Sequence, residues 1–318
     1  MILAKLCLAL PLAGGPEVKW TAPAVFVPGH PFEVEVELAA PQGGATIAGW
    51  LLKPAAFTVD GEPLGPRDDK GTVELPSGFK ISGRIDLGPI ISKSADFKLD
   101  YGSSASGGGA FEVTVREGVP AGTNFMQMAP EELSSYQLLL RTNRGDILLK
   151  MWPDVAPGHV RNFLDLAYIK FYDGSIFHRV VPNFMVQGGD PTGTGTGNGP
   201  RTLEAEFSDR RHVRGVLSMA RQGTPATPGP QDPLRNSASC QFFIVQADSA
   251  HLDGGYSAFG EVVLGMDVVD EISTTALNPG NRPKSPQVIE RAIVVRVPGA
   301  APEGGASEAG GGERSGGR

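Results

Sequence analysis

The sequence predicts a mainly β protein built from two domains. Apolar and polar residues alternate along much of the first 118 residues, and short apolar runs bounded by glycine or proline fill the remainder. Only two longer stretches show helical spacing. The chain has 318 residues, more than one domain usually holds. We therefore expect a small β-sandwich followed by a closed β-barrel that two helices cap.

Composition excludes several classes of partner. Charged residues make up 20% of the chain and apolar residues 40%, as in soluble globular proteins. The net charge of −7 gives no support to a nucleic-acid or phospholipid partner. No run approaches the 18 or so apolar residues that an integral membrane segment needs. The five histidines are scattered without ligand spacing, so we expect neither a metal nor another cofactor.

Residues 1–15 have the outline of a signal peptide. Lys5 precedes a short apolar run, and Ala13 and Gly15 are placed like a cleavage site. This predicts an exported or periplasmic protein. A mis-assigned start or an ordinary first strand is the alternative, with a cytoplasmic location. Removal of Cys7 with the leader would leave Cys240 alone, where it is expected to act as a small hydrophobe.

Residues 16–118 are predicted to form the sandwich, of immunoglobulin-like type. Apolar side chains alternate with polar ones at residues 32–38, 97–101 and 111–116, which is typical of half-buried antiparallel strands. Nothing in this half indicates chemistry, so a binding or spacer role is expected. Residues 119–135 are predicted to be a linker that includes a short helical turn at 129–133. Residues 299–318, rich in glycine, are predicted to be a disordered tail.

The remaining domain, 136–298, begins with two strands, at 136–141 and 146–151. The Arg-Gly-Asp tripeptide at 144–146 is explained by the turn between them rather than by cell adhesion. A helix starting near Pro157 follows, with an apolar face at Val160, Phe163, Leu164 and Ala167. Glycines at 193, 195, 197 and 199 predict a loop, since no helix follows to form a phosphate site. A second helix is predicted at 265–273 and a last strand at 288–297.

One stretch, residues 171–190 (FYDGSIFHRVVPNFMVQGGD), carries a single arginine in an apolar, glycine-bounded run. Arg179 could be a strand residue whose head reaches water. Alternatively, it is a fixed cation at the edge of an apolar pocket.

Several further motifs follow along the chain, and their order is informative. They are GVLSMA at 215–220, SCQFFI at 239–244, HLDG at 251–254, and Phe259-Gly260. Together with the stretch 171–190 they resemble the cyclophilin family of peptidyl-prolyl isomerases, from about Tyr136 to Val297. The resemblance implies a closed eight-stranded cyclophilin-like β-barrel with two capping helices. It also implies catalysis of rotation about X-Pro bonds in proline-containing polypeptide clients, without a cofactor.

The resemblance further implies roles for individual residues. Arg179 would be the catalytic donor, assisted by Gln187 and Phe184. The residues that would bind substrate are Met185, Ala220, Arg221, Gln241, Phe243, His251, Leu252 and Tyr256. Three of them depart from well-known members. His251 replaces a tryptophan, Tyr256 a histidine and Arg221 an asparagine. The first change makes binding of the cyclic peptide cyclosporin doubtful.

The loop Arg221–Asn236 is about ten residues longer than the compact family version and contains four prolines. It is either a tolerated surface insertion or a flap over the groove that narrows the choice of clients.

The sequence leaves two other functions to consider. A hydrolase could be built from Ser218, His178 and Asp190, but Ser218 lies inside an apolar strand without a nucleophile elbow. The second alternative is a proline-peptide-binding or scaffolding module with little turnover, in which the sandwich recognises the client. It shares the pocket of the enzyme, so the sequence discriminates poorly between the two.

Overall fold

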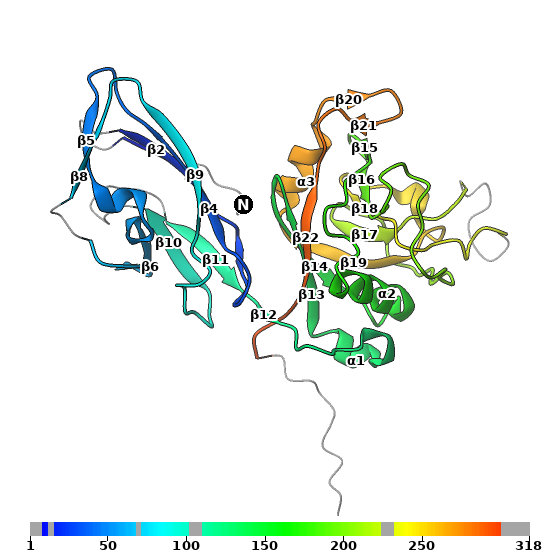
Figure 1. Cartoon of the computed structure of the whole chain (residues 1–318). Coiled ribbons are helices and arrows are strands. Elements are labelled where there is room, and N and C mark those ends of the chain that lie inside the picture. Colours follow the sequence, from blue (N-terminus) through cyan, green and yellow to red (C-terminus); the bar gives the residue numbers. More distant parts are fainter. Residues whose placement is uncertain (1–7, 12–15, 68–70, 102–109, 224–231, 300–318) are drawn as a thin grey trace, which may run out of the picture.

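The structure is a computed structural model that describes residues 8–11, 16–67, 71–101, 110–223 and 232–299. Cys7, most of the predicted signal peptide, nearly all of the predicted tail and the middle of the proline-rich loop (224–231) lie outside the described residues. In Figure 1 the strands of the first half lie to the left, and a larger curled sheet with its helices lies to the right.

The N-terminal half forms two main sheets. The first has the order β1 (Leu8–Pro11), β2 (Glu17–Thr21), β4 (Glu33–Ala39) and β9 (Lys80–Asp86). The second has the order β3 (Val25–Phe26), β11 (Phe111–Val115), β10 (Phe97–Tyr101), β6 (Phe57–Val59) and β7 (Glu62–Pro63). A hairpin of β5 (Ala45–Ala48) and β8 (Thr72–Leu75) and two short 3₁₀ turns, η1 (Gly49–Leu52) and η2 (Pro54–Ala56), complete it.

The alternating pattern places one side chain in two between these sheets. Trp20 of the first sheet is 1% exposed and meets the rings of Phe57 and Phe111 of the second at 5.6 and 4.4 Å. In β10 and β11 the odd-numbered apolar residues are buried and the polar ones between them face outward. The two sheets therefore share one core, as a sandwich requires.

The C-terminal half consists of a nine-stranded sheet with helices packed around it. Its order is β12 (Glu117–Gly118), β22 (Ile289–Arg296), β13 (Tyr136–Thr142), β14 (Gly145–Met151), β19 (Ala258–Leu264), β17 (Val216–Met219), β18 (Phe242–Val245), β16 (Met185–Gly188) and β15 (Arg179–Val181). Two short strands, β20 (Leu277–Asn278) and β21 (Arg282–Pro283), pair separately. The helices are α1 (Pro130–Leu133), α2 (Pro157–Tyr168) and α3 (Met266–Ser273), with 3₁₀ turns η4 (Phe125–Gln127) and η5 (Ala250–Leu252).

The expected closed eight-stranded barrel is not what the strand pairing gives. Among the described residues the sheet has two ends, β12 and β15, and no strand ladder joins β15 to β22. The β15 end nevertheless approaches β22, the neighbour of β12, because the chain before β15 meets the chain before β22 through a single bridge between Ile176 and Val288. Backbone hydrogen bonds from Gly174 and Phe177 to residues 287–289 extend this contact. The sheet is therefore curled around its core rather than continuously paired.

Helix α2 covers the core where its spacing predicted. Val160, Phe163 and Leu164 are fully buried, and Phe163 meets the rings of Phe242 and Phe259 at 5.1 Å. Glu206 accepts hydrogen bonds from the backbone N–H groups of Gly158 and His159, both at 2.9 Å. A carboxylate there satisfies free donors of the first turn and opposes the helix dipole favourably.

The predicted linker, 119–135, is in fact part of the C-terminal core. Phe125 and Leu133 are fully buried, and the ring of Phe125 packs at 5.1 Å from that of Tyr136. Just before it, β12 pairs with β22 and so adds a strand to the sheet. The connection between the two halves is therefore held along most of its length.

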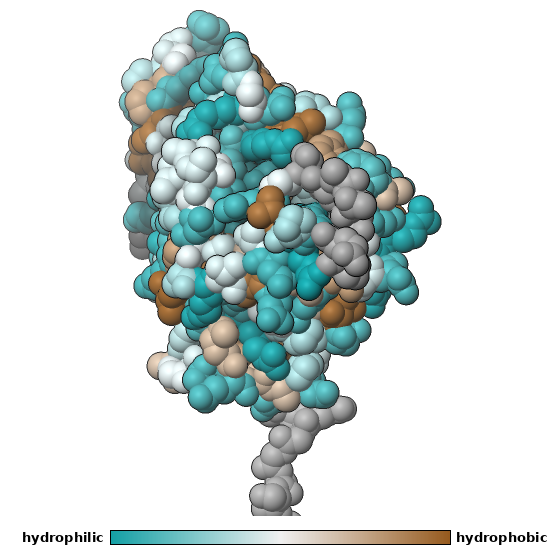
Figure 2. All heavy atoms as spheres, turned by 90° about the vertical axis from the view of Figure 1, so that its right-hand side faces the viewer, coloured by the Kyte–Doolittle hydropathy of each residue, from teal (hydrophilic) through white to brown (hydrophobic). Residues whose placement is uncertain are grey.

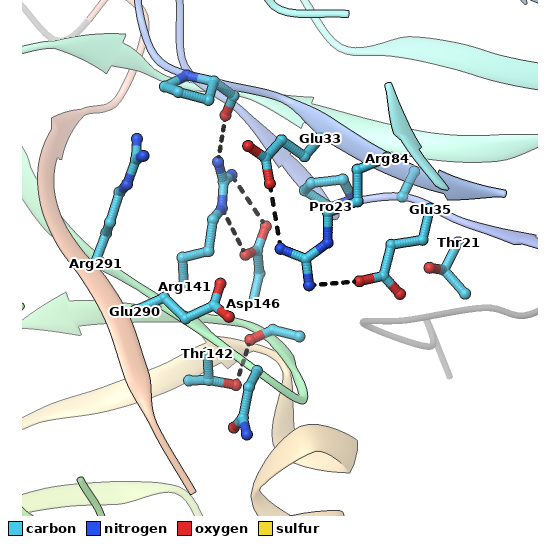
Figure 3. A pocket seen from close by; sticks show the side chains of 14 residues that line it. Thr21, Pro23, Glu33, Glu35, Arg84, Arg141, Thr142, Asp146, Glu290 and Arg291 are labelled. Carbon is cyan, nitrogen blue, oxygen red and sulfur yellow. Dashed lines mark hydrogen bonds and ion pairs between the residues drawn. The ribbon is translucent and has the colours of Figure 1, made fainter. Parts of the chain in front are cut away.

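A buried ion pair fixes the junction of the two domains (Figure 3). Asp146 is 1% exposed and accepts hydrogen bonds from the Arg141 guanidinium at 3.1 Å and from the backbone N–H of Val25 at 3.1 Å. The same guanidinium donates to the carbonyls of Val25 and Pro31, at 2.8 and 2.7 Å. Beside it, an apolar cluster joins the domains through Val25, Val27, Leu139, Leu148, Ile293 and Val295.

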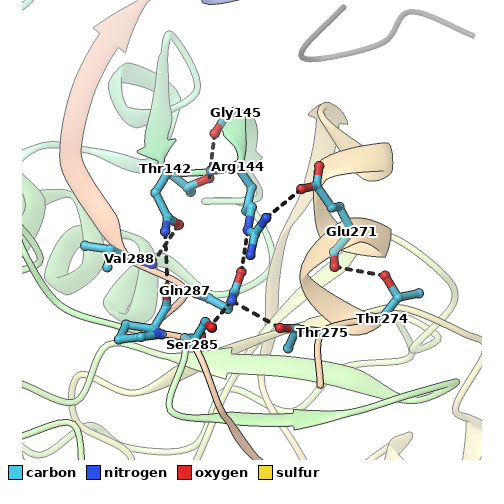
Figure 4. A network of polar contacts seen from close by, with 11 residues as sticks. Thr142, Arg144, Gly145, Glu271, Thr274, Thr275, Ser285, Gln287 and Val288 are labelled. Carbon is cyan, nitrogen blue, oxygen red and sulfur yellow. Dashed lines mark hydrogen bonds and ion pairs between the residues drawn. The ribbon is translucent and has the colours of Figure 1, made fainter. Parts of the chain in front are cut away.

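The Arg-Gly-Asp tripeptide is therefore structural. Arg144 donates to Glu271 at 3.0 Å and to the buried amide of Gln287 at 2.8 Å, which ties the β13–β14 turn to α3 and to the approach to β22 (Figure 4). Asp146 is buried in the junction. Neither charge is free for a receptor.

Figure 2 views the molecule from the side of the C-terminal half. Hydrophobic residues are scattered over this face among polar ones and do not gather into one broad patch. A site for a ligand on this face would therefore be small and locally built.

We predict that Asp146→Ala destabilises the protein by roughly 3 kcal/mol, because it leaves a largely buried guanidinium and a buried N–H without their acceptor. Chemical denaturation followed by the fluorescence of Trp20, Trp50 and Trp152 measures the change. Glu112→Ala, which removes an exposed partner 3.6 Å from Lys98, is the control and should leave the denaturation midpoint unchanged. Equal stability of both variants would show that the junction does not depend on this pair.

Candidate active site

One row of side chains crosses the sheet at the candidate site. Arg179 of β15 pairs directly with Gln187 of β16, and Gln187 pairs directly with Phe243 of β18. Phe243 in turn faces Ser218 of β17. Directly opposed residues on antiparallel strands project from the same face of a sheet. The register therefore gathers a cation, an amide and an aromatic ring on one surface.

Arg179 is exposed, although the residues around it in the sequence are apolar. The reason is its place on the edge strand, where Val180 turns into the core and is fully buried while Arg179 turns outward. Its head does not simply extend into water, because one guanidinium nitrogen donates to the side-chain oxygen of Gln187 at 3.1 Å. The guanidinium is therefore held beside Gln187, and a role as a fixed cation at the edge of a pocket stays a prediction.

An apolar wall lies beside this row. It is formed by buried Met185, Phe243 and Leu252 (1%, 5% and 6% exposed), with Phe184, Ala220 and Tyr256 partly buried around them. These residues form a cluster separate from the main core, which contains the intervening Val186 and Ile244. The alternation of β16 and β18 therefore sends one set of side chains inward and the other to the site.

Aromatic contacts set the orientation of the apolar wall. The ring of Phe243 meets Tyr256 edge to face, with centroids 5.7 Å apart and planes at 85°. The ring of Phe184 lies 5.2 Å from that of His251, which is exposed at the rim. Such edge-to-face and tilted arrangements are the preferred ones for aromatic pairs. These contacts fix the orientation of the rings relative to one another.

A polar groove continues from the apolar wall. It has a volume of about 290 Å³ and is lined by residues that include Gln187, Gln241, Ala220, Asn198 and Ser237. Gln187 donates to the side-chain oxygen of Gln241 at 3.0 Å. Arg221 also lines the groove, where its charge is paired with Asp232. A chain lying across the apolar wall would find mostly neutral hydrogen-bonding groups here. This suits a peptide backbone.

Known proteins resemble this part of the chain. The family model for cyclophilin type peptidyl-prolyl cis-trans isomerases matches residues 137–294. The peptidyl-prolyl cis-trans isomerase CYP18-1 of Arabidopsis thaliana is 41% identical over 150 residues, covering 45% of this chain and 86% of that protein. The chain belongs to the cyclophilin-type peptidyl-prolyl cis-trans isomerase family.

A second relative and a solved structure are also similar to this part of the chain. Peptidyl-prolyl cis-trans isomerase A of Dickeya dadantii is 41% identical over 176 residues, covering 51% of this chain and 86% of that protein. The crystal structure of a cyclophilin-type isomerase from Cryptosporidium parvum is 29% identical and covers 50% of this chain and 97% of that one, with a TM-score of 0.45. All of these matches concern about half of the chain.

Arg221, a predicted substrate-binding residue of this cyclophilin domain, lies in the lining of the polar groove. Its side chain is 2% exposed and pairs with Asp232 at 2.7 Å. The guanidinium also lies 5.0 Å from the Tyr256 ring centroid and donates to the carbonyl of Gly255 at 2.8 Å. The guanidinium thus holds Asp232 and Tyr256 beside the groove, and a contact between Arg221 and substrate stays a prediction.

The same ion pair anchors the proline-rich loop. Arg221 and Asp232 lie on either side of residues 224–231, and Ser237 donates to the carbonyl of Leu234 and accepts from the backbone N–H of Gln222. Both described ends of the insertion are therefore held beside the groove. Whether the loop acts as a flap stays a prediction.

The imagined hydrolase triad of Ser218, His178 and Asp190 does not form. Ser218 instead lies 3.0 Å from a ring nitrogen of His212, whose other ring nitrogen lies 3.0 Å from Asp253. Ser218 is fully buried, so no substrate reaches its hydroxyl. His212 stacks at 6.3 Å on Phe243 and so supports the apolar wall from inside. Sequence reasoning missed this support, because His212 and Asp253 are distant in the chain and form no motif.

The described part of the chain offers few groups for metal or thiol chemistry. There, no group of three His, Cys, Asp or Glu side chains comes close enough to hold a metal ion. Cys240 is fully buried as a free thiol, and burial raises its pKa to about 11, which suits a packing role. No helix among the described residues is long and apolar enough to cross a bilayer.

We predict that the fold loses stability as the pH falls from 7.5 to about 5. Burial lowers the pKa of His30, His178 and His212 below its ordinary value, against the opposing attraction of Asp190 for His178 and of Asp253 for His212. Below about pH 6.5 the unfolded chain therefore binds more protons than the folded one. Stability is complete above that pH and declines as the pH falls toward the folded-state pKa values.

Denaturant titrations at several pH values measure this slope. His212→Gln should make it shallower. Ser218→Ala, which keeps the buried imidazole, should lower stability at every pH but keep the slope. An unchanged slope in His212→Gln would exclude His212 as a contributor.

Proposed function

We propose that this cyclophilin domain accelerates rotation about X-Pro bonds in polypeptide clients without covalent chemistry, and that Arg179 stabilises the twisted amide. The observation that carries the proposal is the row Arg179–Gln187–Phe243 beside the apolar wall. A proline ring can lie on the wall while the guanidinium stands at its edge.

The reaction demands little chemistry. The cis and trans forms of an X-Pro bond are nearly balanced, but amide resonance separates them by about 18–20 kcal/mol. When the bond twists, the prolyl nitrogen becomes pyramidal and regains its lone pair. A fixed donor aimed at that nitrogen binds the twisted state more strongly than either planar state, and this difference is catalysis.

Arginine suits this role because it stays charged and its donors form a rigid fork. A hydrogen bond to a charged group contributes roughly 1.5–3 kcal/mol. At about 1.36 kcal/mol per decade, that one contact supplies about ten- to a hundredfold in rate. The remainder comes from holding the proline ring against Phe184, Met185 and Phe243 and from excluding water there.

The proposal extends to partners and location. The clients would be proline-containing polypeptides, and the N-terminal sandwich, of immunoglobulin-like type, would contact the client or act as a spacer. We propose an exported or periplasmic location from the sequence of residues 1–15. Cyclosporin would bind weakly, because His251 lacks the indole donor implied by the family resemblance. A scaffold with little turnover is the rival function, and the first experiment below separates the two.

Replacing Arg179 by alanine should lower kcat/KM on an Ala-Pro peptide by about ten- to a hundredfold. Arg179→Lys should recover only part of the loss, because a point charge replaces the fork. Line-shape or exchange NMR on the full chain measures the rate. Arg161→Ala, which removes an α2 arginine that donates to the Met128 carbonyl, is the control and should leave the rate intact. If Arg179→Ala is as active as the parent, the assigned role is wrong; an inactive parent supports the scaffold.

The mechanism also predicts a rate that is nearly flat between about pH 6 and 8, because no proton is transferred in the reaction. The exchange rate should be measured across this range on one peptide without ionisable side chains. A bell-shaped profile would instead indicate acid–base catalysis.

A further inference from the structure

A buried carboxylate organises the glycine loop behind the candidate site. Asp190 follows β16 and is fully buried. It accepts hydrogen bonds from the backbone N–H of Thr192 at 2.7 Å and of Gly197 at 3.2 Å, as well as from that of Gly195 and from the Thr192 hydroxyl. Residues 192–197 therefore fold around one anion that belongs to the protein itself.

The glycines are required by this arrangement. A Cβ atom on Gly197 would lie 2.0 Å from a carboxylate oxygen of Asp190, so no larger residue fits there. Gly195 has a φ of +92°, which L side chains rarely adopt. Burial alone would raise the pKa of Asp190, but the N–H groups outweigh it and lower the pKa to about 2. The Asp190 carboxylate is therefore charged at neutral pH.

The loop presents its carbonyls to the active site. Both Gly195 and Gly197 accept hydrogen bonds from the side-chain nitrogen of Gln241, at 3.1 and 2.8 Å. Two acceptors that face the same end of an amide leave only one orientation for it, because a carbonyl cannot donate. Gln241 must therefore turn its oxygen away from the loop.

That choice propagates to the arginine. The oxygen of Gln241 accepts from the side-chain nitrogen of Gln187, so Gln187 must turn its own oxygen toward Arg179. The oxygen of Gln187 then accepts from the guanidinium at 3.1 Å. If either amide were flipped, Arg179 would face an NH₂ group and lose this partner. The loop thus determines the polarity of the whole relay.

We propose that Asp190 is a positioning residue for Arg179, which acts through the glycine loop and the two glutamine amides. The inference rests on the proposed function of Arg179. It assigns a purpose to residues 193–199 that the sequence pattern alone did not reveal. It also explains why a charged group lies fully buried so close to a site that needs no proton transfer.

The test uses the full chain with Asp190→Asn, which keeps the size of the side chain but loses an acceptor and the charge. We expect kcat/KM on the Ala-Pro peptide to fall by about five- to tenfold, with the peptide Kd nearly unchanged, because positioning acts on the transition state. In the ¹⁵N spectrum the side-chain Nε–H signal of Arg179 should shift or broaden. Asp173→Asn, at an aspartate that accepts from the backbone of Ala292 at 2.8 Å, is the matched control and should change neither signal nor rate.

A double-mutant cycle separates positioning from general loss of structure. In the Arg179→Ala background, Asp190→Asn should lower kcat/KM by less than about twofold, because the group through which it acts is gone. Gln241→Leu, which cuts the relay without touching the loop, provides the second variant in case Asp190→Asn folds poorly. It should reproduce the loss of rate and the change in the Arg179 signal.

The outcomes are distinguishable. If Arg179→Ala leaves the rate intact, the proposed function fails. If Arg179→Ala is impaired while both Asp190→Asn and Gln241→Leu keep full rate and an unchanged Arg179 signal, the relay is wrong and the proposed function stands. A full five- to tenfold loss from Asp190→Asn in the Arg179→Ala background also overturns the relay, because the effect then does not pass through the arginine.

Discussion

The site depends on strand register. Arg179, Gln187 and Phe243 come from three different strands, and only their direct pairing places them in one row on one face. Because side chains alternate along a strand, a slip of one residue would send the arginine toward the core and bury the apolar wall's residues on the wrong side. The pairing is held by the main core, where Val180, Val186 and Ile244 fix the inner face. Packing inside the sheet and chemistry outside it are thus set by the same backbone.

The electrostatic character of the site follows from which charges are neutralised. The charge of Arg221 is paired with Asp232 and lies against the ring of Tyr256. The charge of Asp190 is balanced by hydrogen bonds from backbone N–H groups. Neither residue therefore offers an unpaired charge to a ligand. Arg179 has only a neutral amide as its partner in the relay. In the proposed mechanism, a cation that is held but not neutralised keeps its field for the substrate. This arrangement fits a reaction in which a lone pair develops transiently and no proton moves.

The N-terminal sandwich is joined to the family domain by more than a tether. The Arg141–Asp146 pair, the shared apolar cluster and the short strand β12 together connect the two parts. Breaking a buried pair is costly, so the junction resists a change of angle more than an exposed linker would. The sandwich therefore packs directly against a cyclophilin domain whose relatives match only about half of this chain.

The sequence by itself determined the β class, the strands whose polarity alternates, and helices α2 and α3, because period and turns are local properties of the chain. The family motifs also named candidate site residues, whose roles stay predictions. The sequence could not show that Arg179 is exposed on an edge strand, that residues 119–135 enter the core, or that the sheet is curled without a continuous ladder. Nor could it show that Asp190 folds the glycine loop or that His212 meets Asp253 behind Phe243. These features depend on contacts between residues far apart in the chain, and only the folded backbone brings such partners within hydrogen-bonding distance.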